Sequence, residues 1–109
     1  GESDQVEKNS EEYYIEKITN LKNALKYEVG IDKFGIIRVG RFTKTENDDK
    51  IINAQYNVCK TDPDFVMLTE ITESLCQDPE FLNHDFKGHY SEKGYAAIGT
   101  AAAKGLKNI

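Results

Sequence analysis

Tryptophan is absent from this chain, and cysteine, histidine and proline occur only twice each. With so few histidines, and with no CxxC or HExxH spacing, the sequence does not predict a metal site. The two cysteines, Cys59 and Cys76, are too few for a disulfide framework, and we expect them to be reduced and buried. A single bridge between them stays open if the protein is secreted. We expect no cofactor.

Long apolar runs are also missing. No stretch approaches the about 18 residues that a membrane span requires, so we expect no membrane partner. Acidic residues outnumber basic ones by 19 to 14, which gives a net charge of -5 without any Lys/Arg cluster. Nucleic acid is therefore an unfavourable partner, whereas a sugar or a neutral or cationic ligand is easier to accommodate. The polar N-terminus shows no signal peptide, but an upstream start would leave export, and hence localisation, open.

The 109 residues suffice for one domain with a modest core. We expect residues 1–10 to be a polar connector. An apolar stripe of Tyr14, Ile18, Leu21 and Leu25 then predicts a helix that Ser10 caps and Gly30 ends.

Two β-rich runs, residues 34–42 and 65–69, predict buried strands. Between them we expect a helix that Asn47 or Asp48 caps and that ends at Asp62-Pro63. Residues 70–90 look irregular, with helical turns near 71–75 and 79–82. Ser91 should cap a last helix over 92–107, whose small residues would let it approach a sheet closely.

Alternation of helices and strands indicates an α/β fold with parallel strands. Two strands are few for such a sheet, which normally has four or more and is covered on both faces. We therefore expect the first strands of the sheet to precede Gly1.

The segment from Asp85 to Tyr95 places a carboxylate and a histidine just before a helix start. His89 is the candidate general base, and Asp85, four residues earlier, could fix its tautomer. A solvated loop histidine beside a surface aspartate is the alternative interpretation. Glu70 and Glu73 follow a predicted strand and are either ligand contacts or loop charges. No serine lies in a nucleophile elbow.

Two motifs together resemble a known family. Gly1-Glu2-Ser3-Asp4, followed by Tyr13-Tyr14, resembles the "QGESD … YY" block of the sialate O-acetylesterase-like domain, which overlaps with carbohydrate esterase family 6 of the SGNH hydrolases. The run from His89 to Gly99 resembles the terminal "HYS-x-x-GY-x-x-IG" block of that family. Asn53-Ala54-Gln55 and Asp62-Pro63 resemble its middle part.

The resemblance implies a flavodoxin-like three-layer α/β/α sandwich that removes O-acetyl groups from sugars such as acetylated xylan or sialic acid. It makes residues 1–109 the C-terminal portion of one esterase domain. The nucleophilic serine and an oxyanion-hole glutamine would lie in an N-terminal portion, on the same or a separate chain. His89 would be the catalytic base, Asp85 the acid, and Gly1 and Glu2 part of the oxyanion side. No metal or cofactor is implied.

The assignment of Asp85 as the acid follows least directly from the resemblance, because the family usually has Asp-x-x-His and the spacing here is one residue longer. Asp78 or Glu70 could orient His89 instead. Two other hypotheses remain open for the whole chain: a catalytically inactive SGNH-like binding or assembly module, and an independent small α/β domain.

Overall fold

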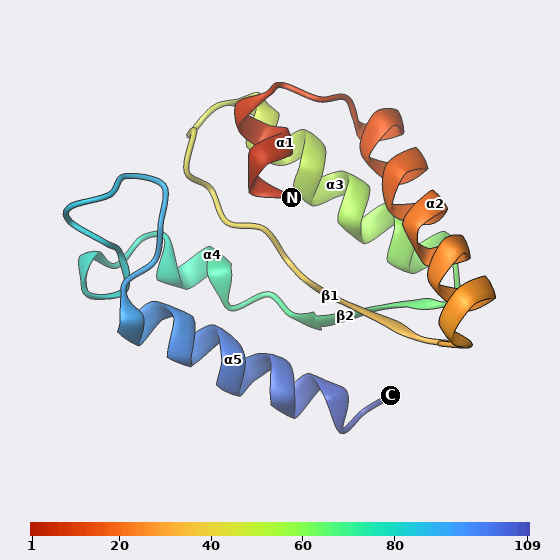
Figure 1. Ribbon diagram of the computed structural model, residues 1–109. Coiled ribbons are helices and arrows are strands. Elements are labelled where there is room, and N and C mark those ends of the chain that lie inside the picture. Colours follow the sequence, from red (N-terminus) through yellow and green to blue (C-terminus); the bar gives the residue numbers. More distant parts are fainter.

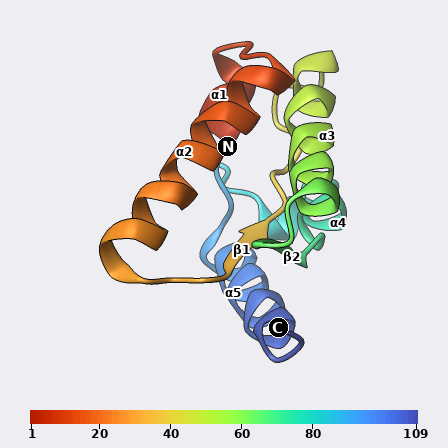
Figure 2. The same ribbon diagram turned by 90° about the vertical axis from the view of Figure 1, so that its right-hand side faces the viewer.

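The computed structural model describes every residue from Gly1 to Ile109. Two parallel strands, β1 (Phe34–Ile37) and β2 (Phe65–Thr69), form the central sheet, and helices lie on both sides of it (Figure 1 and Figure 2). The α/β class with parallel strands is thus confirmed. The other elements are α1 (Glu2–Val6), α2 (Glu11–Val29), α3 (Glu46–Thr61), α4 (Thr72–Leu75), the 3-10 helix η1 (Pro79–Phe81) and α5 (Glu92–Leu106).

Helix α2 begins and ends where the sequence predicts. The Ser10 hydroxyl accepts a hydrogen bond from the backbone N–H of Tyr13 at 3.1 Å, and Gly30 ends the helix with a φ of 73°. A positive φ is accessible to glycine because it has no Cβ.

The apolar stripe of α2 is only partly buried. Tyr14 is buried against α3, but Leu21 is 58% exposed, contrary to prediction. The neighbouring Lys22 is buried instead, because its ammonium lies 2.8 Å from the Asp62 carboxylate and 3.2 Å from that of Asp64. The two acidic partners lie 40 and 42 residues later in the sequence, so helix periodicity alone does not reveal these ion pairs.

Strand β1 is shorter than the predicted run of residues 34–42. Phe34 pairs with Phe65, but the register becomes irregular between Ile36 and Ile37. Beyond the strand, the N–H of Val39 donates to the side-chain oxygen of Gln55 at 2.9 Å rather than to another strand. The outer edge of β1 carries no strand, so the sheet has two strands only.

The N-terminal residues form a short helix, α1, where a connector was predicted. Its Gln5 is buried and donates through Nε2 to the carbonyl of Gly40 at 2.9 Å. The same nitrogen lies 3.4 Å from the carbonyl of Asp48 in α3, so α1 is held beside α3 (Figure 1). Five residues are too few to show a helical period in sequence.

Helix α3 is capped by Thr45, not by Asn47 or Asp48. The buried Asp48 carboxylate instead turns back to accept hydrogen bonds from the Lys44 N–H and the Thr43 hydroxyl, both at 2.7 Å. Helix α3 ends at Asp62, as predicted.

Helix α5 approaches the sheet closely, as its small residues predict. Ser91 caps it by accepting from the Gly94 N–H at 3.1 Å. A Cβ on Gly105 would meet the carbonyl oxygen of Leu68 in β2, and one on Gly94 would meet that of Phe81. Glycine at these two positions therefore sets the distance between α5 and its neighbours. Both cysteines are free, Cys76 buried and Cys59 half-buried.

Candidate functional site

The two segments that carry the family-like motifs, one around Glu2 and one around Tyr90, meet in space. The Tyr90 hydroxyl donates to Oε2 of Glu2 at 3.2 Å across a separation of 88 residues. The same oxygen of Glu2 accepts from the backbone N–H of Gly40 at 3.1 Å. One carboxylate oxygen thus joins α1, the segment after β1, and the segment before α5.

Tyr90 is the buried member of this contact. Its ring packs edge-on against Phe42, with 5.0 Å between centroids, and against Tyr95 at 5.5 Å. Its oxygen lies 3.5 Å from Sγ of Cys76. Burial, reinforced by Cys76 and the nearby Glu2 carboxylate, raises the pKa of Tyr90 far above its ordinary value. The hydroxyl therefore stays protonated at neutral pH and acts as a donor.

His89 is exposed beside this contact. His89 lines a cavity of about 390 Å³ together with Glu2, Ser3 and Phe42. The backbone of its segment is fixed, because the His89 carbonyl accepts from the Asn83 N–H at 3.0 Å. A solvent-accessible imidazole among polar groups is the kind of side chain that transfers protons in hydrolases.

Asp85 does not touch the imidazole in this structure. It is exposed, its carboxylate makes no hydrogen bond to His89, and its N–H donates to Oδ1 of Asn83 at 2.9 Å. The carboxylates that share the His89 cavity are those of Glu2 and Glu7. The alternative acids lie elsewhere: Asp78 caps η1, and Glu70 accepts from the hydroxyl of Tyr56.

Gly1 lies on the other side of Glu2. It lines a second cavity of about 390 Å³, bounded by Ile37 at the open edge of β1 and by Ile98 of α5. Glu2 lines both this cavity and that of His89, whereas Gly1 does not line the His89 cavity.

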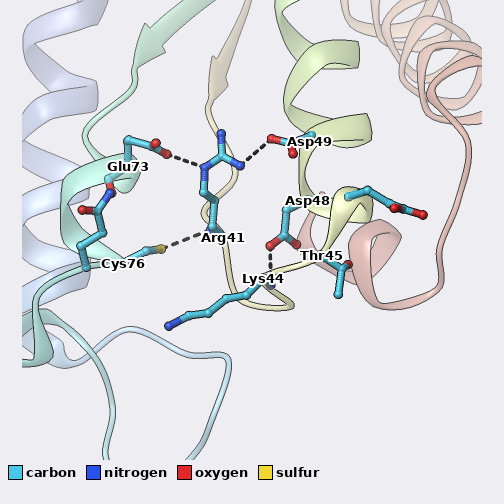
Figure 3. A pocket seen from close by; sticks show the side chains of 9 residues that line it. Arg41, Lys44, Thr45, Asp48, Asp49, Glu73 and Cys76 are labelled. Carbon is cyan, nitrogen blue, oxygen red and sulfur yellow. Dashed lines mark hydrogen bonds and ion pairs between the residues drawn. The ribbon is translucent and has the colours of Figure 1, made fainter.

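A third and larger cavity, of about 570 Å³, lies where the segments after β1 and β2 converge. Figure 3 shows Arg41 at its centre, between Glu73 of α4 and Asp49 of α3. Ligand sites of open α/β sheets commonly occur at this edge. The segments around Thr45 and Glu73, which follow β1 and β2, meet at this cavity, whereas His89 lines a separate one.

Several of the charged side chains in the larger cavity form ion pairs with one another. Arg38 and then Arg41 hold the pKa of Glu73 below its ordinary value through hydrogen bonds. Hydrogen bonds from Arg41 to Asp49 and Glu73 in turn raise the pKa of Arg41. Glu73 therefore anchors the arginines that follow β1, which favours the interpretation as a structural charge over that as a ligand contact.

Sequence reasoning did not single out Gly40 or Cys76. A Cβ on Gly40 would meet both Sγ of Cys76 and the hydroxyl of Tyr90, and would lie 3.3 Å from Oε2 of Glu2. A glycine inside a predicted strand, here residues 34–42, is the signal that could have indicated this close approach. Cys76 has no comparable signal in the sequence.

No group of three or more His, Cys, Asp or Glu side chains is arranged to hold a metal ion. None of the helices combines the length and the apolar character needed to cross a membrane. No family model, curated protein or solved structure matches this chain.

Proposed function

We propose that this chain is the C-terminal portion of a flavodoxin-like, three-layer SGNH-type esterase domain that removes O-acetyl groups from carbohydrates. The observation that carries the proposal is the contact between Glu2 and Tyr90, because the two family-like motifs lie at opposite ends of the chain and meet there. A chance likeness of two short motifs does not require them to be neighbours in space.

In this proposal His89 is the catalytic base. A serine in the N-terminal portion attacks the acetyl carbonyl while His89 takes the proton of the hydroxyl. His89 then returns that proton to the sugar oxygen as the C–O bond to the acyl group breaks. Water, deprotonated by His89, then attacks the acyl-serine, and His89 returns this proton to the serine oxygen as its bond to the acyl group breaks and acetate leaves. Gly1 and Glu2 belong to the oxyanion side, which stabilises the negative charge of the tetrahedral intermediates.

Asp85 keeps the orienting role that the resemblance implies. Because it lies on the exposed loop between Asn83 and Gly88, a shift of this loop would be needed to bring its carboxylate to the imidazole. Catalytic hydrogen bonds often form only when the active site is complete. Glu2 competes for the role, because it shares a cavity with His89 already.

The partner of this chain is then the N-terminal portion of the same domain. The outer edge of β1 offers unpaired backbone groups to a further strand. The cavity beside this edge is lined by Ile37, Tyr14 and Ile98, which suits a strand that is apolar on both faces.

Acetate release from acetylated xylan or acetylated sialic acid by the full-length protein tests the proposal. A serine-directed fluorophosphonate should stop turnover, and peptide mapping should place the label outside residues 1–109. A matched Ser3→Ala variant should retain full activity, since Ser3 shares the cavity of His89 but is not the proposed nucleophile. Loss of activity in Ser3→Ala, or no acetate release at all, would contradict the proposal.

The open edge of β1 also favours a second candidate, an inactive SGNH-like binding or assembly module. Ile37 at this edge is 41% exposed, which is unusual for a parallel strand. The module would neither react with the fluorophosphonate nor release acetate, and an Ile37→Lys substitution would weaken its association with another chain. The enzyme, in contrast, reacts with the probe.

A further inference from the structure

The base candidate His89 directly precedes Tyr90, which is buried. The segment is extended here, with a bridge between Leu82 and Tyr90. Successive side chains of an extended segment point to opposite sides. Tyr90 accordingly enters the core, where it is 4% exposed, while His89 faces solvent and the cavity.

The hydrogen bond from the Tyr90 hydroxyl to Glu2 connects this segment to α1. The hydrogen bonds of the next residue connect the segment to a different element. The hydroxyl of Ser91 donates to the carbonyl of Glu80 at 3.0 Å, and the Ser91 N–H donates to that of Phe81 at 2.9 Å. These bonds fix the segment to η1, but they do not set its position relative to α1.

The acceptor is itself held in place. Oε2 of Glu2 accepts a hydrogen bond from the N–H of Gly40 at 3.1 Å, and the carbonyl of Gly40 accepts one from Nε2 of Gln5 at 2.9 Å. Two residues of α1, Glu2 and Gln5, therefore bind the same residue. A hydroxyl bound to Glu2 is consequently fixed relative to α1 as a whole.

We propose that Tyr90 is a positioning residue for His89: its hydroxyl, bound to Glu2, holds the imidazole over the cavity that α1 lines. The catalytic meaning of this role rests on the proposed function, whereas the structural link does not. The Tyr90 hydroxyl is buried and already donates to Glu2, so its role is to hold His89 in place.

Kinetics of the full-length protein give the first test, with Tyr90→Phe as the variant. The ring packing stays and only the hydroxyl is lost. We expect kcat to fall about tenfold with KM unchanged, because a displaced base weakens the transition state and not substrate binding. Tyr95→Phe is the matched control: this ring touches that of Tyr90, its hydroxyl makes no hydrogen bond, and its kcat should stay within about twofold.

Nitrogen-15 NMR of the imidazoles gives a second test that needs no turnover. His84 and His89 lie on the same loop, and both are exposed. Tyr90→Phe should shift or broaden the His89 signals and leave those of His84 unchanged. Signals are assigned by a His84→Gln variant.

Glu2→Gln is the second variant, should Tyr90→Phe fail to fold. Because Tyr90 and Glu2 share one hydrogen bond, Tyr90→Phe should disturb the His89 signals less in the Glu2→Gln background than in the wild-type protein. Unchanged His89 signals in both variants, or an unchanged kcat in an active Tyr90→Phe enzyme, would overturn the inference. If the wild-type protein shows no turnover but Tyr90→Phe changes the His89 signals as expected, the proposed function is refuted and the structural link between Tyr90 and His89 stands.

Discussion

The side-chain oxygen of Gln55 accepts a hydrogen bond from the backbone N–H of Val39 at 2.9 Å, just beyond the end of β1. Its side-chain nitrogen donates to the Tyr14 hydroxyl at 3.0 Å. One buried amide thus joins α3 to the segment after β1 and to α2. It satisfies a backbone group that would otherwise be buried without a partner.

Gln55→Leu should therefore destabilise the protein although it keeps the side-chain size. The Val39 N–H and the Tyr14 hydroxyl would both lose their partner, at a cost of about 2–4 kcal/mol in the free energy of unfolding. Urea denaturation measures it. The control is Gln77→Leu, an exposed amide, which should change stability by less than about 0.5 kcal/mol. Equal effects of the two substitutions would refute the bridging role.

The glycines of α5 make a matched pair. Nothing lies within 4 Å of a Cβ added to Gly99, whereas one added to Gly105 would meet the backbone of Leu68. Gly99→Ala should stabilise the protein by about 0.5–1 kcal/mol through helix propensity. Gly105→Ala gains the same propensity but must push α5 from β2, so it should destabilise by about 1–3 kcal/mol. Thermal melts that show the same sign for both would contradict the docking of α5.

The ion cluster at the start of β2 should make stability depend on pH. Hydrogen bonds from Lys22 to Asp62, and from Lys26 and Lys22 to Asp64, lower the pKa of both carboxyls. Their stabilising effect is complete above the unfolded pKa of about 3.9 and is lost as pH falls through the lower folded pKa. The pKa of Lys22 is raised, chiefly by Asp62, so its effect is lost only as pH rises through the folded value, above about 10.4.

Urea midpoints across the acid range measure this dependence. Lys22→Met should lower the midpoint at pH 7 and flatten its fall toward low pH. Lys26→Met removes one exposed partner of Asp64 and should have the smaller effect. A larger effect of Lys26→Met would show that the buried lysine is not the main partner.

Much of the fold follows from local sequence signals, and the differences have tertiary causes. Ser10 and Ser91 cap helices as predicted, because the cap is a contact within a few residues. Leu21 and Lys22 exchange their expected burial because acidic residues about 40 positions later neutralise the lysine. Asp48 does not cap α3, because its carboxylate accepts a hydrogen bond from the backbone N–H of Lys44, which precedes the helix.

In the candidate site, too, the sequence indicates the residues but not the tertiary contacts. His89 and Asp85 could be selected from their order in the sequence, but their lack of contact depends on the conformation of an exposed loop. The contacts of Glu2 with Gly40 and Tyr90 span 38 and 88 residues, and no local pattern encodes such distances.

The orienting acid can be identified by comparing Asp85→Asn with Glu2→Gln in the full-length protein. If Asp85 orients the base, Asp85→Asn should lower kcat by about 10⁴-fold, since the imidazole loses its tautomer partner. Glu2→Gln should then cost only the about tenfold expected from loss of positioning. The reverse order of effects would assign the role to Glu2 and contradict the role of Asp85.

The central claim, that His89 is the base of an acetylesterase, is tested most directly by replacing each histidine in the full-length protein. His89→Ala should lower kcat for acetate release by about 10⁴-fold or more, with the circular dichroism spectrum unchanged. His84→Ala, on the same exposed loop, should retain wild-type turnover. Turnover by His89→Ala equal to that of His84→Ala would remove His89 from the mechanism and contradict the account.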